Sequence, residues 1–149
     1  MTHNQLQAIC YKEACQLYHP YVIRRLISIP NDMHVGNLVR WKQYEAIGVT
    51  PGVWDMQFNW FDILEYITPD DTSEDNRIIP ATHWFEFKVG ADVLSPAQLK
   101  FRKTMLPLGH KFYVISDKET FLQHIRTIVE STLHIAKQIW QEEVKYGVE

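Results

Sequence analysis

The chain has 149 residues, of which 46% are apolar and 22% charged, and its formal net charge is −3. This composition excludes a disordered or fibrous chain and predicts one compact domain over residues 1–149. The acidic total argues against a protein that coats nucleic acid non-specifically, because such binding depends on neutralised phosphates. A local basic face remains compatible with it.

The sequence contains no apolar run long enough to cross a bilayer, and residues 1–7 lack the layout of a secretory signal. We therefore expect a soluble, cytoplasmic protein. Cys10 and Cys15 lie five residues apart on one predicted helix, a spacing that suits neither a disulfide nor a pair of metal ligands. Both are predicted to be buried thiols.

The first half of the chain predicts two helices and a strand. Apolar residues recur at helical spacing over residues 4–17, and residues 22–29 form either a short helix or the lead into a strand. Residues 38–47 predict a helix that ends at Gly48. Aromatic and β-branched residues over 53–67 predict a strand or one arm of a hairpin.

The second half continues the alternation. Residues 68–82 are polar, acidic and bounded by prolines, which predicts an exposed loop. Residues 83–89 are apolar on both faces, as in a central strand. Ser95 and Pro96 open a helix that runs towards Gly109, a short buried strand follows at 112–115, and residues 118–146 predict a helical extension of one or two helices. The order predicts an α/β domain with a small mixed sheet flanked by helices.

A possible catalytic centre lies in the predicted central strand. Glu86 and Lys88 stand two residues apart, so their side chains point to the same face. If the strand that begins near Asp55 pairs with it, three polar groups meet there. Two carboxylates can hold Mg²⁺ or Mn²⁺, and a lysine can orient the attacking water in phosphodiester hydrolysis. An isolated Glu-X-Lys is also a common ion pair on a half-exposed strand.

Five motifs in order make the chain resemble the VRR-NUC branch of the PD-(D/E)XK nucleases. The motifs are Ile29-Pro30-Asn31, the segment from Gly48 to Asp55, Phe85-Glu86-Phe87-Lys88, the segment from Leu94 to Gln98, and Gly109 before the last strand. The resemblance implies a restriction-endonuclease-like fold and a Mg²⁺- or Mn²⁺-dependent endonuclease for DNA. Small members of the family imply branched DNA, such as a Holliday junction or a flap, and a homodimer. By similarity, Asp55 and Glu86 bind metal, Lys88 assists catalysis, and Gln98 lies beside the site.

The chain departs from the family pattern at three places. Trp54 stands where the family usually has proline, and the segment between Asp55 and Glu86 is longer than usual. The first helix lacks the family's glutamate ahead of Gln7, so Glu13 is the available carboxylate, either as a metal ligand or as a solvated residue. These departures keep open a second hypothesis, a catalytically silent nucleic-acid-binding or regulatory module on a nuclease scaffold.

Three further groups of residues have alternative roles. The basic residues Lys100, Arg102 and Lys103 either follow a DNA backbone or form a solvated helix face. The seven histidines show no paired ligand spacing, which favours surface or packing roles, although His83 is expected near the mouth of the site. The aromatic group is expected in the core or at an interface rather than as a base-stacking platform; it consists of Trp54, Phe58, Trp60 and Phe61.

Overall fold

The computed structural model describes residues 1–29, 38–46, 48, 50–63, 78–132, 137–138 and 141–142. The strands are β1 (Leu26–Ser28), β2 (Met56–Ile63), β3 (Ile78–Phe87) and β4 (Lys111–Ile115). The helices are α1 (His3–Leu17), α2 (Pro20–Ile23), α3 (Leu38–Ala46), α4 (Pro96–Met105) and α5 (Lys118–Glu130), and a 3-10 turn, η2 (Leu106–Leu108), follows α4. The predicted α/β fold is confirmed.

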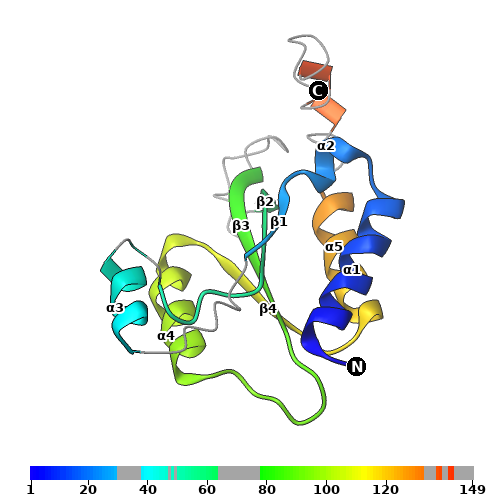
Figure 1. Cartoon of the computed structure of the whole chain (residues 1–149). Coiled ribbons are helices and arrows are strands. Elements are labelled where there is room, and N and C mark those ends of the chain that lie inside the picture. Colours follow the sequence, from blue (N-terminus) through cyan, green and yellow to red (C-terminus); the bar gives the residue numbers. More distant parts are fainter. Residues whose placement is uncertain are drawn as a thin grey trace.

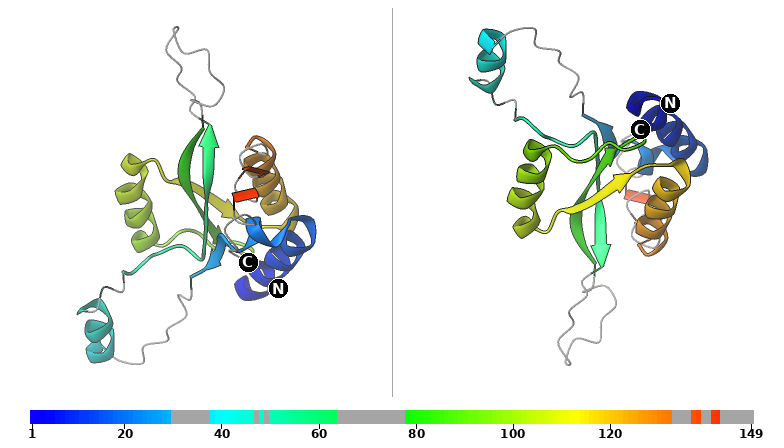
Figure 2. Two further views of the ribbon diagram at one scale, coloured as in Figure 1. Left: turned by 90° about the horizontal axis from the view of Figure 1, so that it is seen from above. Right: turned by 90° about the horizontal axis from the view of Figure 1, so that it is seen from below.

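The sheet lies between helices, with α1 and α5 against one face and α4 against the other (Figure 1; Figure 2). Its strand order is β1-β2-β3-β4. The pairs β1/β2 and β2/β3 are antiparallel, whereas β3 and β4 are parallel, so the sheet is mixed. The chain passes from β3 to β4 through α4, which supplies the crossover that a parallel pair needs.

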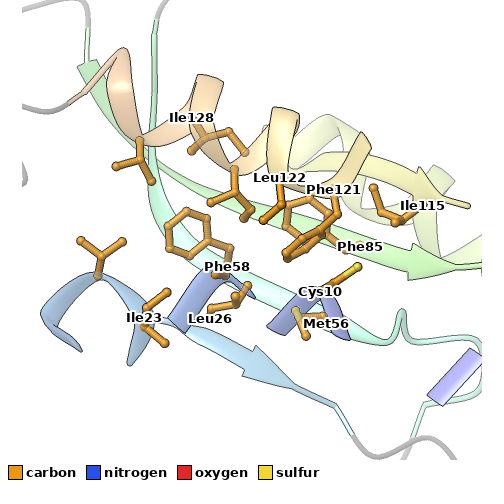
Figure 3. Close-up of a cluster of buried hydrophobic side chains, with 14 of the residues drawn as sticks. Cys10, Ile23, Leu26, Met56, Phe58, Phe85, Ile115, Phe121, Leu122 and Ile128 are labelled. Carbon is orange, nitrogen blue, oxygen red and sulfur yellow. The ribbon is translucent and has the colours of Figure 1, made fainter. Parts of the chain in front are cut away.

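The hydrophobic core lies between the sheet and the pair α1 and α5 (Figure 3). Met56 and Phe58 of β2 and Phe85 and Phe87 of β3 point to this side, where Phe121 of α5 contacts both β3 rings. Because side chains alternate along a strand, Trp84 and Glu86 point to the opposite face. Trp84 packs edge-on against Phe101 of α4, at 5.1 Å between ring centroids. The sheet therefore presents one largely apolar face and one face that carries polar groups.

The expected elements agree with the structure over most of the described chain. The helices at 4–17, 38–47 and from Ser95 onward are confirmed, and residues 20–28 contain both a short helix and a strand. Gly48 and Gly109 have positive φ, as residues that end helices often do. Within the predicted helical extension at 118–146, the structure has α5, which ends at Glu130. Most of residues 131–146 lie outside the described part of the chain.

Two predictions are corrected by the structure. The loop predicted at 68–82 extends too far along the chain, since β3 already begins at Ile78; residues 68–77 lie outside the described part. Cys10 is buried, and burial raises the pKa of its thiol to about 12, but Cys15 is exposed because it lies on the outer side of α1. Among the helices that the structure describes, none is both long and apolar enough to cross a membrane.

Candidate active site

Asp55 lies at the point where the chain enters β2. The register that pairs Met56 with Phe85 brings the Asp55 side chain beside the end of β3, where its Oδ2 accepts a hydrogen bond of 2.9 Å from the backbone N–H of Phe87. The carboxylate thus continues the β2/β3 ladder beyond the last backbone pair. The pairing of β2 with β3 therefore fixes the position of Asp55 relative to Glu86.

Glu86, Lys88 and Gln98 form a compact side-chain network on the same face. Lys88 Nζ lies 2.9 Å from Glu86 Oε1, which confirms that the two side chains share a face. Gln98 Nε2 donates to the same Glu86 oxygen at 2.5 Å, and Gln98 Oε1 accepts from Lys88 Nζ at 3.1 Å. Each of the three side chains therefore contacts the other two.

The first turn of α4 holds Gln98 in this network. Ser95 is the N-cap, Pro96 occupies the first turn, and the Gln98 backbone N–H donates to Ser95 Oγ at 3.2 Å. Gln98 Oε1 in return accepts from the Ser95 N–H at 2.8 Å, which completes a capping box. One side chain thus caps the helix and binds the Glu86–Lys88 pair.

Trp54 joins the Asp55 side of the site to α4. The indole is fully buried, packs edge-on against Phe112 at 4.8 Å between ring centroids, and its Nε1 donates to the Gln98 carbonyl at 3.2 Å. Gly52 lets the chain pass this close: its φ is +76°, and a Cβ added there would lie 2.3 Å from the Ala97 carbonyl carbon. Trp54, which immediately precedes Asp55, is therefore hydrogen-bonded to the backbone of Gln98, whose side chain binds Glu86.

The electrostatics of the site centre on Glu86, whose side chain is 2% exposed. Burial raises the pKa of Glu86 above its ordinary value, and the negative charge of Asp55 raises it further, while Lys88 and Gln98 act in the opposite direction. Among the described residues, nothing donates a hydrogen bond to Glu86 Oε2, although this atom is buried. A buried carboxylate oxygen without a partner is costly, and a bound cation would satisfy it.

The donor set fits a hard divalent cation. Asp55 and Glu86 offer carboxylate oxygens, the ligands that Mg²⁺ and Mn²⁺ prefer. Across the described part of the chain, no three histidine, cysteine, aspartate or glutamate side chains come together as a metal cluster. Two carboxylates suffice for Mg²⁺, which usually keeps several waters and takes substrate phosphate oxygens as further ligands.

Two sequence-based placements are corrected by the structure. Glu13 is not brought to this cluster: it lies on α1, against the apolar face of the sheet, and its Oε1 is 3.8 Å from Lys118 Nζ of α5. His83 does not lie at the mouth of the site either. It is buried on the same apolar face, where its ring nitrogens contact Tyr113 Oη at 3.1 Å and the Phe61 carbonyl at 2.9 Å, and burial lowers its pKa.

The three basic residues lie on α4, two turns or less beyond Gln98. Lys100 and Lys103 are exposed and lie three positions apart, on one side of the helix, whereas Arg102 is half-buried. Arg102 and Lys103 also fall in the last turn of α4, where positive charge stabilises a helix end. The structure is compatible with either role that the sequence left open.

Gln7 is a residue of this region for which the sequence predicts no role. Its Nε2 donates to Ser28 Oγ at 2.9 Å and to the Asp55 carbonyl at 3.4 Å. The Asp55 carbonyl also accepts from the Ile29 N–H at 2.8 Å. Only the arrangement of α1 against β1 reveals these contacts, since nothing in the spacing of Gln7 and Asp55 predicts them.

The sheet and its flanking helices define an α/β fold with a mixed four-stranded sheet. More particularly, the chain has the fold of a VRR-NUC domain: a solved structure described as "VRR_NUC domain protein" superposes with a TM-score of 0.60, over 88% of this chain and 90% of that one, at 13% sequence identity. No family model matches the sequence, and no curated protein matches it either. At this identity the similarity establishes the fold.

Proposed function

We propose that this chain is a metal-dependent DNA endonuclease whose centre consists of Asp55, Glu86, Lys88 and Gln98. The observation that carries the proposal is the network around Glu86, a buried carboxylate beside a second carboxylate, in which one Glu86 oxygen has no hydrogen-bond donor among the described residues. A purely structural ion pair has no need of this arrangement, because burying an unsatisfied carboxylate oxygen destabilises the fold.

Each residue has a chemical role in this proposal. Asp55 and Glu86 would hold Mg²⁺ or Mn²⁺; when bound, the ion offsets charge on the scissile phosphate and makes hydroxide available at neutral pH. Lys88 carries three N–H donors, and Glu86 and Gln98 accept two of them. The third can orient the attacking water or contact the developing negative charge. Gln98 fixes both partners in place.

The proposal extends to the substrate. The VRR-NUC fold and the motif resemblance favour DNA, with branched forms such as a Holliday junction or a flap as the first substrates to try. A homodimer would present two such centres to two strands. Lys100, Lys103 and Arg102 on α4 would contact phosphates on either side of the cut.

The direct test incubates the purified protein with labelled single-stranded, duplex, flap and four-way-junction DNA, with Mn²⁺ or with EDTA. We expect cleavage of at least one DNA form with Mn²⁺ and none with EDTA, and loss of cleavage in Asp55→Asn. Cleavage that persists in EDTA would contradict the metal-dependent mechanism.

A second candidate, a catalytically silent nucleic-acid-binding module, is favoured by one observation: the described residues bring only two acids to the centre. Lys88→Met separates the two functions, because methionine keeps the aliphatic stem and removes the donor. For a nuclease, we expect DNA and metal binding close to those of the parent with cleavage reduced by about a hundredfold or more. A parent that binds DNA but cuts no form with any divalent ion would favour the silent module.

A further inference from the structure

A pocket of about 570 Å³ opens beside Asp55, on the side of the site away from α4. It lies between α1 and β1, the edge strand of the sheet. Gln7, Ala8 and Tyr11 contribute one wall from a single side of α1, while Ser28 and Ile29 contribute the other. Asp55 belongs to the lining, and it is the residue that the pocket shares with the carboxylate centre.

The lining combines apolar surface with polar groups. Aliphatic surface is combined with the phenol of Tyr11, which is 38% exposed, with the amide of Gln7 and with the hydroxyl of Ser28. Among the described lining residues there is no lysine, arginine or histidine. The pocket is thus suited to a neutral group with a flat face and hydrogen-bonding edges, and it is not suited to a phosphate.

Gln7 connects this pocket to the carboxylate centre. Its two amide hydrogens are used by Ser28 Oγ and the Asp55 carbonyl, which leaves Oε1 to accept from a ligand. A donor on a nucleobase that meets Oε1 would therefore contact the side chain that supports Asp55.

We propose that this pocket binds the sugar and base of the nucleotide that adjoins the cleaved phosphate. The inference rests on the proposed function, which places that phosphate at Asp55 and Glu86; the attached nucleoside then has to lie beside them. A base that is stacked and paired within a duplex cannot enter a pocket, and extracting it costs free energy, least when the base is already unpaired. The site accordingly selects nucleotides that are unpaired at the cut, as at junctions, flaps and bulges.

The test fills the pocket from an exposed helix position. Ala8→Trp places an indole in the pocket, and Gln16→Trp, at an exposed position of the same helix outside the lining, is the matched control. Binding of a fluorescent oligothymidylate is measured with Mg²⁺ in the Lys88→Met background, so that the probe stays intact. We expect Ala8→Trp to weaken binding by about tenfold or more and Gln16→Trp to leave it within about twofold.

Three further measurements make the result specific. Tyr11→Ala, which removes the aromatic wall, is expected to weaken oligothymidylate binding by about fivefold or more. With Lys88 intact, the parent is expected to cut a duplex beside a single unpaired nucleotide in preference to the fully paired duplex, and Ala8→Trp to lose this preference. Mn²⁺ binding should stay unchanged in both pocket variants, because neither residue is a metal ligand.

The outcomes distinguish this proposal from the proposed function. If Ala8→Trp and Gln16→Trp bind oligothymidylate equally well, or if the preference for unpaired nucleotides survives in Ala8→Trp, the nucleoside pocket is overturned while the metal centre stands. If the parent binds no Mn²⁺ and cuts nothing, yet Ala8→Trp still abolishes oligothymidylate binding, the nuclease fails and the pocket stands as a nucleoside-binding site. A parent that does not bind oligothymidylate overturns the pocket.

Discussion

At the scale of single residues, Glu86 shows that the chemistry of the site works against its stability. Its pKa is raised by burial and by the charge of Asp55, so the folded state binds a proton more readily than the unfolded chain. As pH rises from the ordinary carboxyl pKa of 4.5 to the higher value in the fold, the contribution of this group to the unfolding free energy falls. Above that range the carboxylate is charged, as its proposed role as a metal ligand requires.

Glu86→Gln tests whether the charge of Glu86 lowers the unfolding free energy. Glutamine keeps the shape and the oxygen that accepts from Gln98, but it has no charge to bury. At acidic pH we expect the variant and the parent to have similar free energies of unfolding without metal; towards pH 7 the variant becomes the more stable of the two. Cleavage should fall by about a hundredfold or more. Urea unfolding at several pH values and a cleavage assay measure both. A variant that matches the parent at acidic pH but is less stable than it near pH 7 would show that the Lys88 ion pair outweighs the cost of burial.

We expect Trp54 to act as a positioning residue of the proposed site, because its indole N–H reaches the Gln98 carbonyl while the next residue is Asp55. Trp54→Phe keeps an aromatic ring against Phe112 and removes the donor. We expect a loss of about 1–2 kcal/mol in unfolding free energy and a fall in kcat that exceeds the change in KM, since Asp55 and Gln98 are no longer joined. Equilibrium unfolding and steady-state kinetics check the two effects.

The control for this variant is Trp84→Phe, on the same face of the sheet. Trp84 is also buried, and its Nε1 donates to His110 Nδ1 at 2.8 Å rather than to a residue of the site. We expect a similar loss of stability with kcat almost unchanged. If the two variants lose kcat equally, Trp54 contributes to general stability and does not position the site.

At the scale of elements, the sequence predicts best where local chemistry determines the structure. The start of α4 follows from Ser95 as N-cap and Pro96 in the first turn, and the shared face of Glu86 and Lys88 follows from strand geometry. The start of β3 does not follow from the sequence, because Pro80 and the polar Thr82 are typical of a loop. They are tolerated because β4 begins opposite His83, so in the described sheet the first half of β3 pairs with β2 alone.

The exposed side of α4 can be tested for DNA binding through Lys100 and Lys103. If Lys100 and Lys103 contact phosphates, replacing both with alanine should weaken DNA binding and lower the slope of log Kd against log salt by about 0.9 for each phosphate that is no longer neutralised. The rate at saturating DNA should hardly change, since neither residue belongs to the Glu86 network. Lys12→Ala, at an exposed lysine of α1, is the matched control. A slope equal to that of the parent would assign both lysines to an ordinary solvated helix face.

At the scale of the whole molecule, the two faces of the sheet have separate roles. Helices α1 and α5 cover one face of the sheet, and α4 lies against the other (Figure 2). The first face contains the apolar core together with buried His83, and the second contains the Glu86 network. The sequence alone could not assign Glu13 or His83 correctly, because each assignment depends on which face a distant helix covers. The helical periodicity of α1 shows that one side is buried, but it does not show which side of the sheet receives it.

The proposed metal centre links the stability of this whole fold to a divalent ion. Asp55 and Glu86 are far apart in sequence and meet only through the β2/β3 pairing, so an ion that binds both will bind the folded state alone. At a hundredfold excess over its Kd, such an ion adds about 2.7 kcal/mol to the unfolding free energy, which raises Tm by about 5–10 °C for a domain of this size.

We expect Mn²⁺ to produce this shift in the parent and EDTA to reverse it. Asp55→Asn should abolish the shift, and Asp92→Asn, which removes an exposed acid paired with His3, should preserve it. If the Tm of the parent does not respond to Mn²⁺ while DNA binding persists, Asp55 and Glu86 do not form a metal centre, and the fold serves here as a nucleic-acid-binding module.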